Sequence, residues 1–490
     1  MSEEFQHPTE AYSGKSSFDM KLSQERHVVT LSTACAGIGL GWISPVLVKL
    51  MDENEDILSP RISEVEASWL VSTSYLVAFL TNYPWGIVMD YFGRKTCIVF
   101  GMCLTMTVKF MLTFATKAWM LVVERAFSGT LSGMLICASV AYSAEISSKE
   151  IRGSLLSFIN INISLGTLMM FCFGPYLNYF HLNIAITCTV ALCTVPILFL
   201  PESPYYLFSK GRIEESKKVL IYFHRSEYEA TEEIEQYNLA LNSKVNCLEI
   251  FKNKMFSRSL TLAVLFAVLV NLIGQSIVIN YLQSILEITH TNIKSELASV
   301  IVGVIQFVAG ILAALVTDKV DRKPLLVVTL AGTAAGFTGL GPFFKLKELG
   351  YSTEGWINYL PLFSLVAVLF SYSTGPGSIF LTIVSELFEG PARASGVTIS
   401  FSVASLTAFL LTKYFATFVK LIGPVYSYWS LAINTIVAGL FVVIFIPETK
   451  GKSFAEIQSI LKSINEENQR DNREYQRTFS LKNTKLKTHF

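Results

Sequence analysis

Charged residues at matching positions in the two halves of the chain carry the clearest chemistry. The segment GIVMDYFGRK (86–95) has a counterpart, ALVTDKVDRK (314–323), that begins 228 residues later. Their charged residues are Asp90, Arg94 and Lys95 in the first copy and Asp318, Arg322 and Lys323 in the second. Carboxylates and basic groups at this spacing can form charge-assisted hydrogen bonds. We therefore expect an ionic cluster in each half.

Two further marks repeat at nearly the same separation. A glutamate is followed seven residues later by an arginine in both halves, as Glu145 with Arg152 and Glu386 with Arg393. The segment PESP (201–204) is matched by PETK (447–450), 246 residues later. Together the marks predict a duplicated unit, and paired helical bundles around one central site are typical of transporters. The charges on one face could fasten the two units together and release them.

The composition places these motifs in a membrane protein. Of 490 residues, 51% are hydrophobic and 16% are charged, whereas soluble domains have about 25% charged residues. Twelve membrane-spanning helices of about 20 residues each would occupy about half of such a chain. A soluble enzyme is therefore nearly excluded. The net charge of +1 provides no field that would attract nucleic acid.

Twelve apolar stretches are long enough to cross a membrane, and they form two groups of six. The first group is 28–48, 68–89, 97–115, 119–143, 155–177 and 183–200. The second group is 259–286, 297–316, 324–344, 357–385, 394–415 and 425–446. Between the groups, apolar residues recur at helical spacing among many charges, which predicts amphipathic helices outside the bilayer.

We expect five parts in this order. They are a cytoplasmic arm (1–26), a six-helix bundle (27–201), a cytoplasmic helical linker (202–257), a second six-helix bundle (258–446) and a cytoplasmic tail (447–490). The positive-inside rule supports this orientation, because 29 of the 39 Lys and Arg residues fall in the cytoplasmic segments and 8 in the external ones. The arm lacks the pattern of a cleaved signal peptide. The eight cysteines show no metal-binding spacing, so neither metal nor cofactor is expected.

These motifs resemble the signature of the sugar porter family in the major facilitator superfamily. Residues 90–95 match D-x-x-G-R-R/K, Glu145 with Arg152-Gly153 matches E-x(6)-RG, and residues 201–207 match PESPxxL. The segments ELF (386–388) with Arg393 and PETKG (447–451) match two further marks, so the resemblance covers about residues 25–460. It implies an all-α membrane fold of twelve helices in two six-helix pseudo-repeats, which moves a sugar by alternating access. Residues 41–45, GWISP, further resemble insect facilitated trehalose transporters.

The resemblance also implies a sugar site midway across the membrane, between the two bundles. The residues expected to bind the sugar are polar side chains of helices five, seven and eight: Asn160, Asn271, Gln275, Ser276, Asn280 and Gln306. Each could instead bond a neighbouring helix. Val270 replaces a family glutamine and Leu381 replaces the sugar-stacking tryptophan. The resemblance favours trehalose or a hexose as the substrate. The two replacements favour an alternative, a carrier of a non-sugar organic solute. A transport-inactive sugar sensor is a further alternative.

Two features bear on gating. Tyr281 is expected to cap the site from outside. The sequence Gly375-Pro376-Gly377 interrupts helix ten and predicts a hinge, with a static kink as the alternative.

Intramembrane charge is the usual sign of ion coupling. Lys109 and Glu124 lie at similar depth and could pair, and a structural ion pair is favoured over a coupling role. The first span has no acidic residue, which favours facilitated diffusion. We expect a plasma-membrane protein that works as a monomer, with sugar and lipid as its partners and without nucleic acid.

Overall fold

The computed structural model describes residues 28–52, 57–147, 152–223, 226–242, 254–289, 292–317, 319–351, 355–388, 392–450 and 456. Within these ranges the side chains of 152–157, 239–242, 254 and 392–394 are not described. Every regular element of the described residues is a helix. The fold is therefore all-α over this part of the chain, as expected.

The helices form two bundles and a linker. The first bundle contains α2 (Leu31–Gly41), α3 (Ile43–Met51), α4 (Glu64–Phe92), α5 (Arg94–Leu112), α6 (Ala118–Ile146), α7 (Arg152–Phe173) and α8 (Tyr179–Leu198). The linker contains α9 (Pro204–Ser209), α10 (Ile213–Tyr222) and α11 (Glu227–Asn242). The second bundle contains α13 (Lys254–Leu272), α14 (Gln275–Thr289), α15 (Ser295–Thr317), α16 (Arg322–Glu348), the 3-10 helix η1 (Gly355–Tyr359), α17 (Leu360–Thr374), α18 (Pro376–Glu386) and α19 (Ala392–Phe445).

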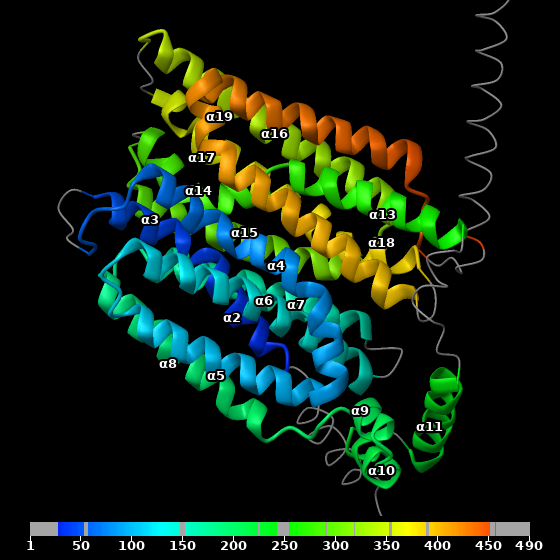
Figure 1. Cartoon of the computed structure of the whole chain (residues 1–490). Helices are drawn as coiled ribbons and strands as arrows, with labels where there is room; N and C mark the ends of the chain where they lie inside the picture. The colour runs from blue at the N-terminus through cyan, green and yellow to red at the C-terminus, as the bar shows by residue number, and fades with distance from the viewer. Residues whose placement is uncertain are drawn as a thin grey trace, which may run out of the picture.

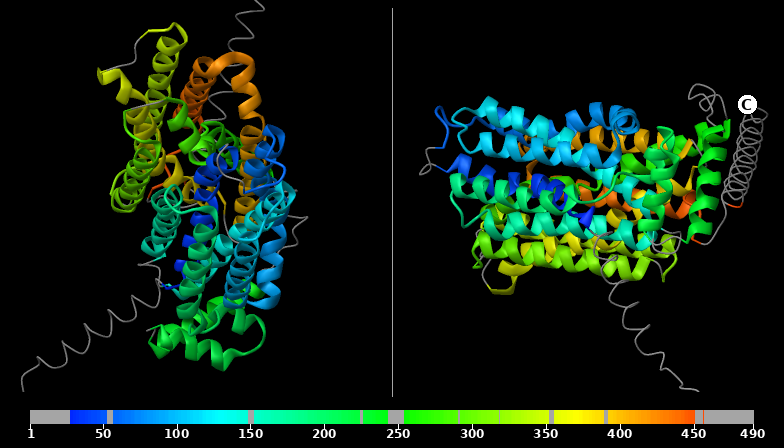
Figure 2. Two further views of the ribbon diagram at one scale, coloured as in Figure 1. Left: turned by 90° about the vertical axis from the view of Figure 1, so that its left-hand side faces the viewer. Right: turned by 90° about the horizontal axis from the view of Figure 1, so that it is seen from below.

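The long helices run in roughly one direction, with the two bundles side by side (Figure 1). The linker helices α9, α10 and α11 lie together beyond one end of the bundles, which we call the linker end. The opposite end, where α3 leads into α4, is called the far end. Both further views keep the linker helices outside the bundles (Figure 2).

The helices are long enough for a multi-pass membrane fold. Among the described residues, nine segments are long and apolar enough to cross a membrane, and α4 and α7 run beside them. As a straight rod, the 54 residues of α19 would extend about 80 Å, far more than a bilayer core of about 30 Å. The chain instead bends at Gly423, which has a φ of 83° and precedes Pro424. This divides α19 into two crossings and fits twelve crossings in all.

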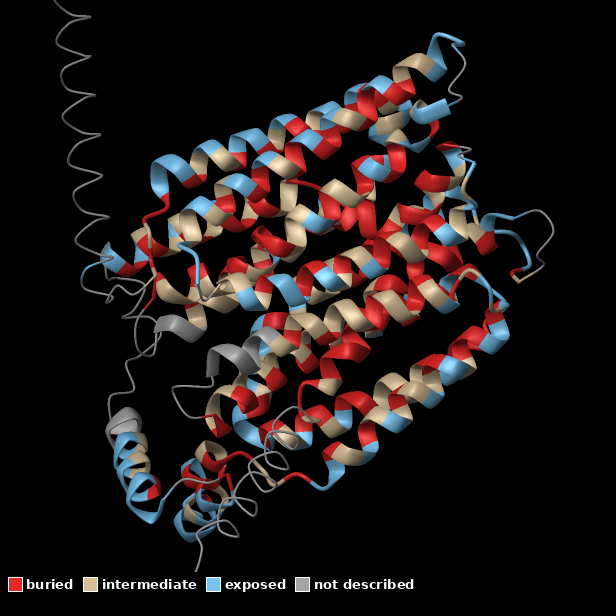
Figure 3. Cartoon of the chain, turned by 180° about the vertical axis from the view of Figure 1, so that it is seen from behind, coloured by how far each residue is buried: buried red, intermediate tan, exposed pale blue. Residues whose placement is uncertain are grey.

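Each bundle has its own apolar core, and large apolar side chains also cover the outer faces. Buried positions gather between the helices, while exposed ones follow the outer surfaces (Figure 3). Leu192 is 75% exposed and Phe199 82% exposed. A lipid environment accepts such side chains, whereas water does not.

Three crossings are interrupted. In the first, the hydrogen-bond ladder is interrupted beside Trp42, which keeps helical φ and ψ of −55° and −39°, because Pro45 has no N–H to donate. The seventh is broken at Gly274, which has a φ of 94°. The tenth is broken at Gly375, as the sequence predicts. The sequence analysis did not predict the first two of these interruptions. It also placed the start of the second bundle at residue 258, whereas α13 begins four residues earlier, at Lys254.

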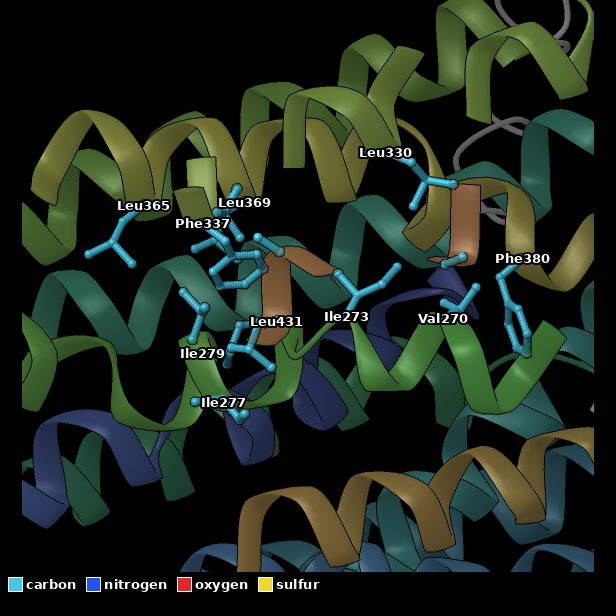
Figure 4. Packing of buried hydrophobic residues seen from close by; sticks show 14 of the residues in the cluster. Val270, Ile273, Ile277, Ile279, Leu330, Phe337, Leu365, Leu369, Phe380 and Leu431 are labelled. Atoms are coloured by element: carbon cyan, nitrogen blue, oxygen red, sulfur yellow. The ribbon is translucent and has the colours of Figure 1, made fainter. Parts of the chain in front are cut away.

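The break in the seventh crossing is packed with apolar side chains. Ile273, Ile277 and Leu431 meet beside it, and Val270 lies one turn before it (Figure 4). Val270 is only 2% exposed. Val270, which stands where the sugar porter family has a glutamine, therefore belongs to the core of the second bundle.

Replacing Gly375 by alanine should destabilise the protein, because the added Cβ would lie 1.8 Å from Thr329 Oγ1. Overpacking of this kind typically costs about 1–3 kcal/mol. We expect the thermal unfolding temperature of the detergent-solubilised protein to fall by several degrees. Gly86→Ala is the matched control, since a Cβ there meets no atom within 4 Å. Equal unfolding temperatures for the two variants would contradict the close approach.

Candidate functional site

The candidate site lies where the two bundles meet. Among the described residues, three helix pairs form most of this interface: α4 with α19, α7 with α15, and α3 with α14. Each pair joins a helix of the first bundle to one of the second. Polar residues along these pairs are therefore the ones that a solute between the bundles would meet.

At the far end, α4 and α19 are joined by polar contacts. Lys413 Nζ donates to Ser68 Oγ at 2.8 Å and lies 3.8 Å from the centre of the Trp69 ring. Closer to the end, one turn before Ser68 on α4 and two turns after Lys413 on α19, Lys420 pairs with Glu64. A cation over an indole ring is attracted to its electron-rich face. These contacts hold the far end closed.

The middle of the interface is also bridged. Asn280 Nδ2 on α14 donates to the Tyr75 hydroxyl on α4 at 2.9 Å. Asn82 Nδ2 on α4 donates to Ser405 Oγ on α19 at 3.4 Å. Both bonds connect the two bundles, so separating the bundles at this level breaks them.

Several of the expected sugar ligands have a buried atom without a partner among the described residues. They are Ser276 Oγ, Asn280 Oδ1 and Gln306 Oε1. The three residues are 8%, 0% and 6% exposed. Buried polar groups are nearly always hydrogen-bonded, so unpaired ones need an explanation such as a missing ligand.

The other three expected ligands are less distinctive. Asn160 and Gln275 are half-buried. Asn271 is also half-buried and donates one amide hydrogen to Ala267 O of its own helix at 2.9 Å. Part of its hydrogen-bonding capacity is therefore already used.

The structure brings some of these residues together and separates others. Ser276 and Asn280 are four residues apart on α14 and share a face. Gln306 lies on α15 between Gly303, which faces Phe171 of α7, and Gly310, which faces Ser164 of the same helix. Asn160 is one turn beyond Ser164 toward the linker end. Asn160 and Gln306 therefore sit at different depths of the α7–α15 contact.

Two contributors were missed from the sequence. Gln283 is 4% exposed and its Oε1 has no partner among the described residues. Tyr75 supplies the hydroxyl that Asn280 bonds. The spacing of Gln283, seven residues after Ser276 on an apolar helix, is the signal that could have found it.

The expected gating residues occupy structurally distinct positions. Tyr281 packs against the apolar cores of both bundles, and its hydroxyl lies 3.5 Å from Thr412 O. Gly375 separates α17 from α18, and Pro376 and Gly377 open α18. Their role in movement stays a prediction.

In each half, the arginine of one repeated motif binds the glutamate of another. Arg94 contacts Asp90 at 2.9 Å and Glu145 at 3.1 Å. In the second half, Arg322 pairs with Glu386. The duplication seen in the sequence is therefore reproduced as two similar ionic clusters at the linker end.

Each cluster is completed by the glutamate of the repeated Pro-Glu motif. Glu202 accepts the backbone N–H of Lys95 at 2.8 Å, and Glu448 accepts that of Lys323 at 2.9 Å. Both lysines stand in the first turn of a helix, α5 or α16. A carboxylate at this place satisfies a free N–H and interacts favourably with the helix dipole.

In the described part of the chain, these ion pairs join residues of the same half. Asp318 and the side chains of Arg152 and Arg393 lie outside the described residues. Fastening of one half to the other at this end therefore stays a prediction. Beside Glu145, a cleft of about 240 Å³ opens between α6, α9 and α11, away from the interface between the bundles.

A buried ion pair lies inside the first bundle. Lys109 Nζ and Glu124 Oε1 are 2.5 Å apart, and both side chains are 3% exposed. The neighbouring Arg125 donates to Gly39 O at 2.8 Å and to Ser74 Oγ at 2.9 Å. The expected pairing of Lys109 with Glu124 is confirmed. Among the described residues, no cluster of His, Cys, Asp or Glu could hold a metal ion.

Two helical bundles with unpaired polar atoms at their shared interface define a membrane transport protein of the major facilitator type. The chain belongs to the sugar (and other) transporter family, whose model matches residues 11–461. It is a multi-pass membrane protein of this family.

Relatives of known name match along most of the chain. The facilitated trehalose transporter Tret1 of Polypedilum vanderplanki is 27% identical over 435 residues, which cover 88% of this chain and 86% of that protein. The human solute carrier family 2, facilitated glucose transporter member 6, is 28% identical over 455 residues, covering 87% and 88%.

Solved structures show the same fold. The inward-open xylose transporter XylE of E. coli superposes with a TM-score of 0.74 at 21% identity, covering 90% of this chain and 99% of that one. The proton:xylose symporter XylE bound to 6-bromo-6-deoxy-D-glucose gives a TM-score of 0.73 at 20% identity, with the same coverage. The expected major facilitator fold is confirmed.

The Glu448 cap should stabilise the protein at neutral pH. Burial alone would raise the pKa of Glu448, but backbone N–H donors from Lys323, Lys450, Arg322 and Thr449 outweigh it and hold the pKa below its ordinary value of 4.5. A lowered pKa stabilises the fold above the ordinary value, and this stability is lost as pH falls through the folded-state pKa.

We therefore expect Glu448→Ala to lower the unfolding temperature at neutral pH by more than Glu448→Gln, which keeps an acceptor. The difference from the unmodified protein should shrink in acid, as followed by thermal unfolding from neutral to acidic pH. The exposed Glu214→Gln is the control. A loss that is independent of pH would contradict the ionised cap.

Proposed function

We propose that this protein carries a sugar, trehalose or a hexose, across the plasma membrane by alternating access and facilitated diffusion. The observation that carries the proposal is the group of buried, unpaired polar atoms of Ser276, Asn280 and Gln306 at the interface of the bundles. Sugar hydroxyls are donors that would pair with them, and a buried acceptor left unpaired is costly. The named activities of the trehalose and glucose transporters that match this chain support the same substrate class.

The binding site that we propose comprises six residues. They are Asn160, Asn271, Gln275, Ser276, Asn280 and Gln306. The three with an unpaired atom are its centre. The half-buried ones complete it as the bundles move.

The closed far end supports an inward-facing state, with the linker end and both termini in the cytoplasm. In this state the ionic clusters stay within each half. In the outward-facing state they fasten the halves together, and the α4–α19 contacts open. Tyr281 then moves as an outer cap, and the break at Gly375, Pro376 and Gly377 absorbs the bending of the tenth crossing.

The buried charges support transport without proton coupling. Glu124 already has an ionic partner in Lys109, at 2.5 Å. The first crossing, residues 28–48, contains no carboxylate that could face Arg125, and Arg125 bonds neutral groups of Gly39 and Ser74 instead. The protein works as a monomer in the bilayer, performs no chemical step and binds no nucleic acid.

Uptake into oocytes tests the proposal directly. Radiolabelled trehalose, glucose and fructose should be compared, with surface expression measured in parallel, and at least one sugar should enter faster than in uninjected cells. Uptake should not exceed equilibration, because nothing drives it uphill. Absence of uptake of every sugar, with confirmed surface expression, would reject the proposal.

Coupling is tested in vesicles by an imposed proton gradient. The gradient should not produce uphill accumulation. Accumulation that Glu124→Gln abolishes while exchange survives would contradict facilitated diffusion.

A non-sugar organic solute is the second candidate, favoured by Leu381 in place of the sugar-stacking tryptophan and by the buried Val270. Saturable uptake of such a solute without any sugar uptake would support it. A sugar sensor would instead bind sugar at the cell surface and transport none.

Opening of the far end can be followed by labelling Ser44→Cys in a cysteine-free background. Ser44 is fully buried where α3 meets α14, so an impermeant maleimide should react slowly from outside. Lys413→Met removes the cation over Trp69, a contact worth about 1 kcal/mol, and should speed labelling several-fold. Lys117→Cys, exposed at the same end, should label equally fast with and without Lys413→Met. If Lys413→Met did not speed the labelling of Ser44→Cys, Lys413 would have no part in closing the far end.

A further inference from the structure

Four polar side chains of α14 lie in one line along the helix. They recur at helical spacing: Ser276, Asn280, Gln283 and Glu287. Buried apolar residues such as Ile277, Leu282 and Leu286 occupy the other faces. The line begins beside the break at Gly274 and runs to the far end. From Ser276 to Gln283 it spans about 10 Å.

This polar line is turned toward the first bundle. Asn280 Nδ2 donates to the Tyr75 hydroxyl of α4 at 2.9 Å. The backbone N–H of Gln283 donates to Ser44 Oγ of α3 at 3.1 Å. Opening of the far end separates α14 from α3 and α4. The polar line of α14 then borders the path from the far end to the sugar site.

The atoms left over on this line are acceptors. Asn280 uses its NH₂ group, since Nδ2 also donates to Ser276 O at 2.5 Å, and its Oδ1 has no partner among the described residues. The side chain of Gln283 lies beside the carboxylate of Glu287, which can accept only from its NH₂ group. Its Oε1 is likewise unpartnered within the described part of the chain. Both residues are over nine-tenths buried.

Packing alone does not account for these two amides. An apolar side chain would fill the same space without burying an unpaired oxygen. Acceptors that lack a donor in the closed arrangement are matched by a ligand rich in hydroxyl groups. The length of the line exceeds the reach of a single ring held at Ser276.

We infer that Gln283 forms an outer sugar subsite beyond Asn280, which is uncovered when the far end opens and which accepts a hydrogen bond from the second ring of a disaccharide. The inference rests on the proposed function and names the substrate class more narrowly. The ring leaves the subsite as α14 closes on α3 and α4. The subsite therefore increases the affinity for two-ring sugars that arrive from outside.

Equilibrium binding to the purified full chain tests this inference. Radiolabelled trehalose, maltose and glucose are the probes, and Gln283→Met is the variant, since it removes the amide and keeps similar volume. We expect this variant to weaken binding of the disaccharides about three- to tenfold, as for a lost hydrogen bond. Glucose binding should stay unchanged, which also shows that the variant is folded.

A control variant on the same helix sharpens the test. Ser284→Ala removes the polar group of the residue that follows Gln283 and points to a neighbouring face, and it should leave the binding of every probe unchanged.

The outcomes distinguish the outer subsite from the proposed sugar transport. Equal losses for glucose and disaccharides, or no loss for any sugar, would overturn the outer subsite. Binding of glucose without any disaccharide by the unmodified protein would overturn the subsite and leave sugar transport standing. Binding of no sugar at all would overturn both.

Discussion

The absence of water in a bilayer core is the constraint on which this structure depends. Every polar group placed there must find its partner within the protein or keep a place for a solute. Thr73, for example, bonds the carbonyl of Trp69 one turn earlier, and Arg125 donates to backbone and hydroxyl oxygens of two other helices, α2 and α4. Against this background, the unpaired amide oxygens of α14 and α15 stand out as positions that the fold itself does not satisfy.

The same constraint explains why the duplicated motifs take the form they do. At the linker end, a helix begins in each half with basic residues, and its free N–H groups need acceptors. Glu202 and Glu448 supply them from the segments that follow the last crossing of each half. An arginine then links this cap to Glu145 or Glu386. Each bundle is thus closed on itself at this end, which lets it move as a unit.

Much of this architecture is readable from the sequence, and the rest is not, for identifiable reasons. Long apolar runs reveal the crossings, because the bilayer sets their length. The helix-ten break is visible because Gly375 and Pro376 limit the backbone. The pairing of Lys109 with Glu124 follows from their similar depth. The break at Gly274 and the bond from Asn280 to Tyr75 are hidden, because they depend on how one helix faces another. Gln283 was missed because it lies outside the motif positions to which the resemblance points.

The two lysines of α19, Lys413 and Lys420, differ in how strongly ionic strength affects their contacts at the far end. Lys420 and Glu64 are 62% and 68% exposed in their side chains, so dissolved ions screen their attraction strongly. Lys413 instead lies half-buried over the face of Trp69, where mobile ions approach less easily. A rise in ionic strength therefore loosens the rim while leaving the deeper contact in place. At high ionic strength, the contact of Lys413 with Trp69 and Ser68 therefore contributes more of the polar attraction across the far end than the pair of Lys420 with Glu64.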